Sequence, residues 1–318
     1  MLTVQILILI AGLALVVFGA DFLVDGASGI ARKAGLSEFV IGLTIVGFGT
    51  SCPELVVSVT GALKGSSDIA IGNVIGSNIF NTLLILGLTA TLMPMTVTSE
   101  NRRMDIPLAL AATCILCGMN LFGGIPRIAG VAFLLLFAGY LFLCFKQNKA
   151  DVQQDEESSD RFYDRLKKTI GGSVALVGAG LCGLVFGGRL FVDSACEIAR
   201  MAGISEKFIA ITILAAGTSL PELATSIVAA IKGKGQLALG NILGSNVFNI
   251  LLILGVSATI TPMSLAGMNN VDMIALLSSA LILLIASYTG SKNKIDRWEG
   301  ILMLAMFAAY YIFLIINL

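Results

Sequence analysis

Long apolar blocks separated by short polar stretches make up this chain. Apolar runs of about 20 residues, the length that crosses a bilayer as a helix, recur along the whole sequence. They cover residues 2–31, 38–63, 69–93, 105–122, 126–145, 169–199, 206–231, 236–261, 271–288 and 298–317. The pattern therefore predicts an all-α integral membrane protein with ten transmembrane helices.

The two halves of the chain carry the same pattern. Aligning residues 41–90 with residues 209–258, at a constant offset of 168 (209 minus 41), gives 27 identities in 50 positions without a gap. Each half contains five predicted spans, an odd number, so the second copy enters the membrane from the opposite face. We therefore predict two inverted five-helix repeats, residues 1–145 and 169–318, joined by a linker over residues 146–168.

Inverted repeats are characteristic of secondary transporters, whose substrate site lies near the bilayer midplane where the halves meet. A duplication kept for helix packing alone is the alternative. The most similar segments of this chain are polar in the middle of the spans rather than uniformly apolar. This placement of polar residues favours transport.

The composition excludes several classes of protein. Of the 318 residues, 57% are hydrophobic and 13% are charged, which is more apolar surface than a soluble domain could bury. The chain has no histidine, so imidazole zinc sites and Ser-His-Asp catalysis are excluded.

The polar linker is too short for a folded domain. Its acidic cluster is either a weak calcium site or, more commonly for such a segment, a solvated loop.

Basic residues are distributed unevenly between the two predicted sides of the membrane. Alternating sides over ten spans places 15 of the 20 basic residues on the side that holds the linker. The positive-inside rule puts that side in the cytoplasm and both termini outside. The first run has neither a preceding Lys or Arg nor a convincing cleavage site, so a retained helix is expected rather than a signal peptide. The predicted location is a cell inner membrane.

The six cysteines lie within or at the edges of apolar runs, where cysteine behaves as a small hydrophobe. Cys114 and Cys117 have the spacing of a redox or metal-binding pair. Because no second pair accompanies them and they lie in the middle of a span, packing is their expected role.

A glutamate follows a proline in a phrase that is written once in each repeat. The phrase reads GTSCPE over residues 49–54 and GTSLPE over residues 217–222. A carboxylate in lipid costs about 2.5 to 3.5 kcal/mol on insertion scales, so Glu54 and Glu222 are functional candidates. The proline lacks the N–H that would pair with the carbonyl four residues earlier. We therefore predict a helix break in each copy, whose freed carbonyls line a polar cavity.

Other oxygen-bearing side chains fall on the same helix faces. Residues three and four apart share a face, so each glutamate lies over the Thr and Ser of its phrase, and the next span carries a Ser and an Asn four residues apart. The predicted set is Thr50, Ser51, Glu54, Ser77 and Asn81 in the first repeat and Thr218, Ser219, Glu222, Ser245 and Asn249 in the second. Carboxylate, amide, hydroxyl and carbonyl oxygens are ligands for Ca²⁺ and Na⁺, whereas Mg²⁺ demands a tighter octahedron.

The charge of the two glutamates favours the exchange of one cation for another over one-way release of a cation. Two carboxylates balance one divalent cation, so a loaded site crosses the bilayer near neutrality. Without a cation, two like charges at close range favour protonation of at least one of them. Crossing of the empty site is therefore unfavourable, and either Na⁺ or protons serve as the counter-ion.

The remaining polar residues of the repeats have other expected roles. The asparagines that face away from the Ser and Asn stripe are expected to be structural; these are Asn73, Asn78, Asn241 and Asn246. Asp25 and Asp193 are candidates for a gate, but helix caps near span ends are the commoner explanation.

These phrases, with the segment GNVIGSNIFN at residues 72–81 and its copy at residues 240–249, resemble the alpha-repeats of the cation/calcium antiporter superfamily. The similarity is greatest to prokaryotic sodium/calcium exchangers and covers both halves of the chain. The resemblance implies a ten-helix fold in which the long first and sixth helices slide against a core of the other eight. It also implies ion sites between helices two, three, seven and eight.

The resemblance implies roles for individual residues. Glu54 and Glu222 would be shared by Ca²⁺ and Na⁺, with the backbone carbonyls of Thr50 and Thr218 completing the Ca²⁺ site. The flanking Na⁺ sites would use Ser51, Ser77, Ser219 and Ser245 with the carbonyls of Gly47 and Ala215. Asn81 and Asn249 would line the centre. Exchangers of this kind can carry aspartate at one of these last two positions, so this chain has one ionisable group fewer there, which bears on sodium stoichiometry.

The sequence therefore predicts an antiporter that exchanges Ca²⁺ for Na⁺ by alternating access. We expect a monomer in the lipid bilayer that needs no cofactor, binds no nucleic acid and is not an enzyme. Exchange of Ca²⁺ for protons and K⁺-dependent Na⁺/Ca²⁺ exchange are the alternatives. A cation channel would use the same oxygens but would conduct without coupled counterflow, and an intramembrane hydrolase would need catalytic partners that the chain lacks.

Overall fold

The computed structural model describes residues 2–147, 169–204, 209, 213, 215–265, 268–289 and 293–316. Two compact units divide the chain. The first unit comprises Met1–Thr50 and Phe142–Asn241, and the second comprises Ser51–Leu141 and Ile242–Leu318. Each unit draws on both halves of the sequence. The predicted linker, residues 146–168, lies outside the described residues except for its first two positions.

Apolar helices of membrane-spanning length dominate the described residues, which confirms the predicted helical membrane architecture. Within the described part of the chain eight helices are long and apolar enough to span a membrane, and a ninth is added if the helices on either side of Ser51 form one broken span. They coincide with nine of the ten predicted runs. The remaining run, residues 206–231, lies partly outside the described residues, and its described part includes α12 (Ala215–Gly217) and α13 (Leu220–Ile231).

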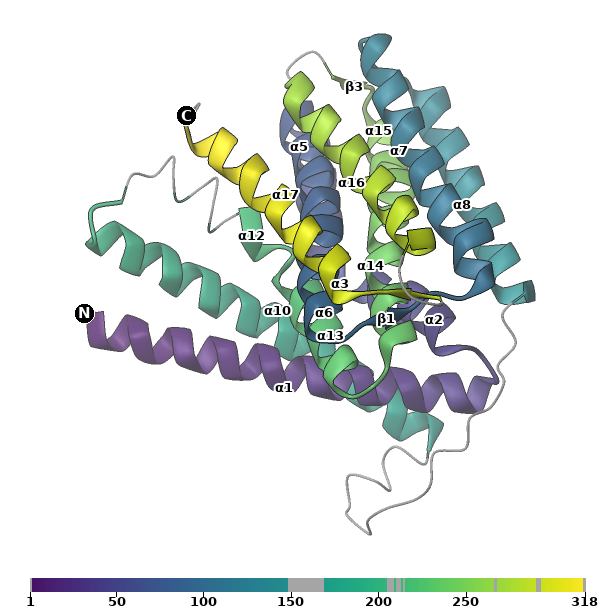
Figure 1. The fold of residues 1–318 in the computed structure, drawn as a ribbon. Helices are drawn as coiled ribbons and strands as arrows, with labels where there is room; N and C mark the ends of the chain where they lie inside the picture. Colours follow the sequence, from purple (N-terminus) through teal and green to yellow (C-terminus); the bar gives the residue numbers. More distant parts are fainter. Residues whose placement is uncertain are drawn as a thin grey trace. The chain divides into compact units, whose positions relative to one another are not determined.

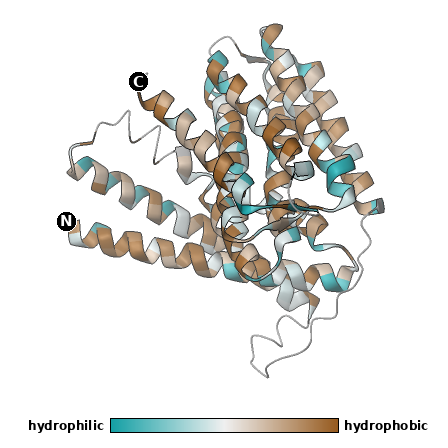
Figure 2. Cartoon of the chain, viewed as in Figure 1, coloured by the Kyte–Doolittle hydropathy of each residue, from teal (hydrophilic) through white to brown (hydrophobic). Residues whose placement is uncertain are grey.

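In the first unit the two longest helices, α1 (Leu2–Ala34) and α10 (Ile170–Met201), lie side by side and antiparallel (Figure 1). Glycines at seven-residue spacing permit a close approach of the two backbones. A Cβ atom placed on Gly19 would lie 2.7 Å from the backbone nitrogen of Leu184, and one on Gly26 would lie 2.6 Å from the carbonyl oxygen of Ser173. The apolar residues at the start of α1 are largely exposed, as a lipid-facing helix requires (Figure 2).

Several shorter helices also belong to the described part of the first unit. They are α2 (Glu38–Ile41), the π-helical turn η1 (Gly42–Val46), α3 (Gly47–Thr50), α12, α13 and the beginning of α14 (Gly235–Val247). The hydroxyl of Ser37 accepts a hydrogen bond from the Val40 amide and so caps the start of α2, as an N-terminal serine commonly does.

The second unit contains most of the other spans. In chain order its helical elements are α4 (Cys52–Leu63), α5 (Ser67–Ile79), η2 (Phe80–Leu86), α6 (Gly87–Leu92), η3 (Asn101–Asp105), α7 (Ile106–Leu121), α8 (Arg127–Gln147), the end of α14, η5 (Phe248–Ile253), α15 (Leu254–Ile260), α16 (Asn270–Thr289) and α17 (Arg297–Ile316). The elements named η are π-helical. The last residues of α8 belong to the first unit.

Two short antiparallel ladders join loops of the second unit. Strand β1 (Met95–Thr96) pairs with β4 (Lys294–Ile295), and β2 (Gly124–Ile125) pairs with β3 (Met263–Ser264). Each ladder connects a loop of the first half of the sequence to a loop of the second. They satisfy backbone groups where the chain leaves its helices. Two-residue strands leave no periodic signal in the sequence, and none was predicted.

Two of the spans that carry predicted ligands are the most buried of the eight spanning helices among the described residues. The most apolar 18-residue window of Ser67–Leu92 is 72% buried and that of Gly235–Ile260 is 94% buried, whereas the window of α17 is only 17% buried. A polar segment at membrane depth is tolerated where protein surrounds it.

The interpretation of Asp25 and Asp193 as helix caps is wrong. Helix α1 continues to Ala34 and α10 continues to Met201, so both aspartates lie well inside a helix and not in its last turn. Asp25 is buried and instead forms an ion pair with Lys232.

Candidate cation site

The helix break predicted from each proline is present in both copies. Helix α3 ends at Thr50, Ser51 leaves the helical conformation with φ −84° and ψ 6°, and α4 begins at Cys52. In the second copy Ser219 has nearly the same angles, φ −88° and ψ 7°, just before α13. Each proline thus falls in the first turn of the new helix, where its missing N–H needs no partner.

Both glutamates occupy the first turn of the helix that follows the break. Unpaired backbone N–H groups and the helix dipole make this end of a helix favourable for negative charge. The Glu54 and Glu222 side chains are both 0% exposed. A carboxylate this deeply buried is costly unless cations or hydrogen-bond donors compensate its charge.

An asparagine holds the backbone of each glutamate in the same way. In the second unit, the Asn73 amide nitrogen donates to the Glu54 carbonyl oxygen at 3.2 Å and to the Ser58 hydroxyl at 3.0 Å. In the first unit, the Asn241 amide nitrogen donates to the Glu222 carbonyl oxygen at 3.4 Å and to the Ser226 hydroxyl at 2.9 Å.

The structural role expected for Asn73 and Asn241 is therefore confirmed, and it is a specific one. Each asparagine fixes the helix turn that carries the glutamate. The sequence interpretation missed their partners Ser58 and Ser226. Their signal was available, because both serines lie four residues after the glutamate and are identical in the two copies.

Within the first unit, Asn241 also reaches the other broken helix. The Thr50 hydroxyl lies 3.2 Å from the Asn241 side-chain oxygen and 3.1 Å from the carbonyl oxygen of Val46. One hydroxyl hydrogen can serve only one of these acceptors at a time. The Asn241 side chain thus connects the end of α3 with α13. Of the other candidates in this unit, Ser219 and Gly47 are buried and Thr218 is half-buried.

Within the second unit, two pairs of predicted residues are in contact. The Ser51 hydroxyl lies 3.0 Å from the Ser245 hydroxyl. The Asn249 amide nitrogen donates to the Ser77 hydroxyl at 3.1 Å and to the Asn78 side-chain oxygen at 2.9 Å. Predicted ligands of the first repeat therefore meet predicted ligands of the second repeat in these places.

Asn81 and Asn249 lie in π-helical turns, η2 and η5, a feature that occurs frequently at functional sites. Both side chains are 0% exposed. Among the described residues, neither polar atom of the Asn81 amide has a hydrogen-bond partner, nor does the side-chain oxygen of Asn249. Leaving such an atom unsatisfied costs about 1–3 kcal/mol, so these atoms are suited to a bound ligand.

The twelve predicted ligands divide equally between the units. The first unit holds Gly47, Thr50, Ala215, Thr218, Ser219 and Glu222, and the second holds Ser51, Glu54, Ser77, Asn81, Ser245 and Asn249. Among the described residues no group of three or more His, Cys, Asp or Glu side chains gathers as a metal cluster. A cation would therefore depend on neutral oxygens beside the carboxylates.

No disulfide joins Cys114 to Cys117.

A group of ion pairs around two lysines was not predicted from the sequence. In the first unit, the Lys232 ammonium lies 2.6 Å from Asp21 and 2.8 Å from Asp25, and two residues later Lys234 lies 3.0 Å from Glu38. The two lysines flank the turn between α13 and α14, and the acids lie on α1 and at the start of α2. These pairs join sequence-distant elements, so no local spacing signals them.

The sequence profile of the family described as "Sodium/calcium exchanger protein" matches residues 4–146 and 172–316, nearly all of both halves. The chain belongs to the sodium/calcium exchanger family. The resemblance drawn from the doubled proline-glutamate phrase is thus confirmed.

Individual relatives are similar over most of this chain. "Sodium/calcium exchanger MaX1" of Methanosarcina acetivorans is 35% identical over 99% of both chains. "Inner membrane protein YrbG" of Escherichia coli is 40% identical over 80% of this chain and 79% of its own length. The solved structure of the sodium-calcium exchanger NCX_Mj is 35% identical, with a TM-score of 0.82 over 98% of each chain.

Membership in the sodium/calcium exchanger family makes this protein a membrane transporter that moves cations by antiport. Its many apolar helices of spanning length agree with that location.

Proposed function

We propose that this protein exchanges Ca²⁺ for Na⁺ across an inner membrane by alternating access, with Glu54 and Glu222 as the carboxylates of a shared ion site. The observation that carries the proposal is the repeated arrangement around these residues. Each is completely buried in the first helical turn after a break, and each has its carbonyl oxygen held by an asparagine. Buried acids at membrane depth mark ion pathways.

The other ligands of the proposed site are neutral oxygens. The carbonyls of Thr50 and Thr218 complete the Ca²⁺ site, and the flanking Na⁺ sites use Ser51, Ser77, Ser219 and Ser245 with the carbonyls of Gly47 and Ala215. Asn81 and Asn249 line the centre. The side-chain oxygens of both asparagines are buried and have no hydrogen-bond partner among the described residues, which supports this assignment because a cation supplies the partner that an orphaned oxygen lacks.

Charge balance supports Ca²⁺ as one of the two ions. Two carboxylates neutralise one divalent cation, whereas the empty site leaves two buried like charges that must take up Na⁺ or protons. Oxygen-only ligand sets suit Ca²⁺ and, equally, Na⁺. The names of the relatives point to the same pair of ions, since MaX1 and NCX_Mj are both called sodium/calcium exchangers.

The proposed architecture is two inverted five-helix repeats with both termini outside and the central linker in the cytoplasm. The gapless match between residues 41–90 and residues 209–258 supports the repeats. The concentration of basic residues on the linker side supports the orientation, and the name of the Escherichia coli relative supports an inner membrane. We further propose that one chain is sufficient for exchange.

Calcium uptake by proteoliposomes tests the function. Vesicles loaded with Na⁺ and diluted into Na⁺-free buffer with Ca²⁺ should accumulate Ca²⁺, and Glu54→Gln and Glu222→Gln should abolish the uptake. Glu299→Gln is a matched control, because Glu299 is also buried but lies in the first turn of α17, outside the two proline-glutamate phrases. Normal sodium-driven uptake in Glu54→Gln would remove the assignment.

Changing the imposed gradient separates the alternatives. Uptake driven by a proton gradient without Na⁺ would indicate Ca²⁺/H⁺ exchange, and uptake that needs K⁺ beside Na⁺ would indicate K⁺-dependent exchange. Current through a planar bilayer without counterflow would indicate a channel.

A further inference from the structure

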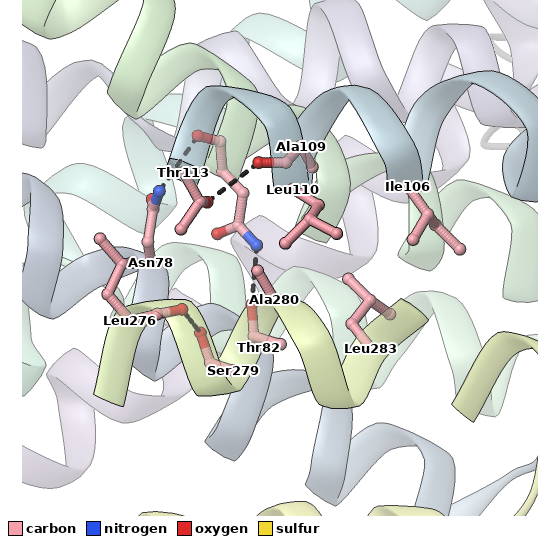
Figure 3. A pocket seen from close by; sticks show the side chains of 11 residues that line it. Asn78, Thr82, Ile106, Ala109, Leu110, Thr113, Leu276, Ser279, Ala280 and Leu283 are labelled. Carbon is pink, nitrogen blue, oxygen red and sulfur yellow. Dashed lines mark hydrogen bonds between the residues drawn. The ribbon is translucent and has the colours of Figure 1, made fainter. Parts of the chain in front are cut away.

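A small polar pocket lies inside the second unit, apart from the twelve predicted ligands. Figure 3 shows it between α5, η2, α7 and α16, with one wall contributed by α14. Its polar lining residues are Asn78, Thr82, Thr113, Asn246 and Ser279. The cavity volume is about 10 Å³. A cavity of this size is about the smallest that can hold a single water molecule. We call it the Asn246 pocket.

Within the described part of the chain, one polar atom of the Asn246 side chain lacks a hydrogen-bond partner. Its amide nitrogen donates to the Thr82 hydroxyl at 2.8 Å, and its backbone carbonyl accepts from the Asn78 amide at 3.2 Å. The side chain is buried, with the residue 7% exposed, and its Oδ1 atom has no hydrogen-bond partner among the described residues. Reversing the amide would leave the nitrogen unsatisfied instead, so either orientation calls for a ligand.

The other groups of the pocket match the needs of that ligand. Thr113 donates its hydroxyl hydrogen to the Ala109 carbonyl at 2.9 Å, and Ser279 donates to the Leu276 carbonyl at 2.7 Å. Both hydroxyls therefore offer lone pairs to the pocket. Thr82 accepts from Asn246, which leaves its own hydroxyl hydrogen to donate. The pocket thus presents one donor and three acceptors.

Charge selects water over a cation. No acidic side chain lines the pocket, so a cation there would be a buried charge without compensation. A water molecule can donate two hydrogen bonds and accept others, and buried waters typically make about three. We propose that the Asn246 pocket binds one ordered water molecule, which donates to Asn246 Oδ1 and to Ser279 or Thr113 and accepts from Thr82.

This water supports a chain of hydrogen bonds that ends at a predicted ligand. Asn246 holds Asn78 through its carbonyl, and Asn78 Oδ1 accepts from the Asn249 amide at 2.9 Å. The orientation of the Asn249 amide, and so the direction of its unpartnered oxygen, depends on this chain. Asn78 and Asn246 are thus positioning residues, a conclusion that rests on the proposed function of Asn249.

The side chains of Asn78 and Asn246 are satisfied differently: Asn78 Oδ1 accepts from Asn249, whereas Asn246 Oδ1 has no partner among the described residues. Asn78 and Asn246 occupy equivalent positions, but the residue four places later is Thr82 in the first copy and Ile250 in the second. The Asn246 amide therefore has a hydroxyl partner, while the Asn78 amide turns to a backbone carbonyl. The Thr82 hydroxyl therefore makes the surroundings of Asn246 differ from those of Asn78, because the second repeat has Ile250 at the equivalent position.

High-resolution maps of the full-length protein test the water directly. In crystals grown with NaCl and in crystals grown with choline chloride, we expect one density peak at about 2.7–3.0 Å from Asn246 Oδ1, and we expect it to be absent in Thr82→Val. A pocket without density would overturn the proposal. So would a peak seen only with Na⁺ and surrounded by oxygens at about 2.4 Å, because that peak would be a cation.

Exchange kinetics test the positioning role. Thr82→Val should raise the Ca²⁺ concentration for half-maximal uptake roughly tenfold, because it leaves the buried Asn246 amide without its hydroxyl partner, and Thr82→Ser should restore it. Thr89→Val is the matched control, since Thr89 is equally buried but donates to the Ile85 carbonyl of its own helix. Equal effects of Thr82→Val and Thr89→Val would overturn the positioning role.

The proposed exchange function and the inferred water molecule can be refuted independently of each other. If the wild-type protein does not exchange Na⁺ for Ca²⁺, the proposed function fails while the density peak still tests the pocket. If it does exchange them and the pocket is dry, only the inference about water fails.

Discussion

The ammonium group of Lys232 lies 2.8 Å from the carboxylate of Asp25, which joins the turn after α13 to the middle of α1. The Asp25 side chain is 10% exposed and that of Lys232 is 25% exposed. An ion pair in this setting is less screened than one at the surface. It fixes α1, a helix held to α10 by glycine contacts, against the helix that carries Glu222.

Removing the ammonium should destabilise the protein. Lys232→Met leaves the Asp25 carboxylate buried beside Asp21, and the expected loss lies between about 1 kcal/mol for exposed pairs and about 3 kcal/mol for buried ones. Thermal unfolding in detergent measures it. Lys234→Met should cost less, because its partner Glu38 is 35% exposed. An unchanged melting temperature in Lys232→Met would show that the pair contributes nothing.

Two glycine substitutions should have effects of opposite sign. Alanine normally stabilises a helix relative to glycine by about 0.5–1 kcal/mol. Gly178→Ala on α10 should show this gain, because its new Cβ would meet no atom of the described residues within 4 Å. Gly19→Ala should instead lower the melting temperature, since its Cβ would lie 2.7 Å from the Leu184 nitrogen. If both variants are stabilised, the glycine contact between α1 and α10 is incorrect.

Removing either asparagine that holds a glutamate carbonyl should impair exchange. Asn73→Ala and Asn241→Ala each remove hydrogen bonds to a glutamate carbonyl and to a serine. We expect each to reduce sodium-driven Ca²⁺ uptake roughly tenfold. Uptake assays on both variants, with Ser58→Ala and Ser226→Ala showing smaller losses, check this. Wild-type rates in either asparagine variant would contradict the role.

Introducing an acid at the centre should distinguish Asn81 from Asn249. Asn81 donates no hydrogen bond within the described part of the chain, so Asn81→Asp should fold normally. Its third carboxylate makes the Ca²⁺-loaded site negative when ionised, so uptake should be slow at high pH and recover as acid protonates it. Asn249→Asp loses two donated bonds and should be less stable. A pH profile of uptake and a melting curve measure the two effects.

Hydropathy predicted the helices well because span length and apolar composition follow directly from bilayer thickness. The breaks at Ser51 and Ser219 were also predicted, since proline removes a donor at a known position. The π-helical turns at Asn81 and Asn249 were not, because they shift hydrogen bonds without changing composition. The pairs of Lys232 with Asp21 and Asp25 join residues some 200 positions apart, which no local pattern encodes. That omission is also why Asp25 was misread as a cap.

The central claim is that one Ca²⁺ ion is shared by Glu54 and Glu222, and a crystal structure of the protein soaked in Ca²⁺ tests it most directly. We predict a single ion with oxygens of both carboxylates at about 2.3–2.6 Å, replaced by weaker Na⁺ density when the crystal is transferred to Na⁺ alone. Two carboxylates that point away from each other, with no ion between them, would contradict the claim.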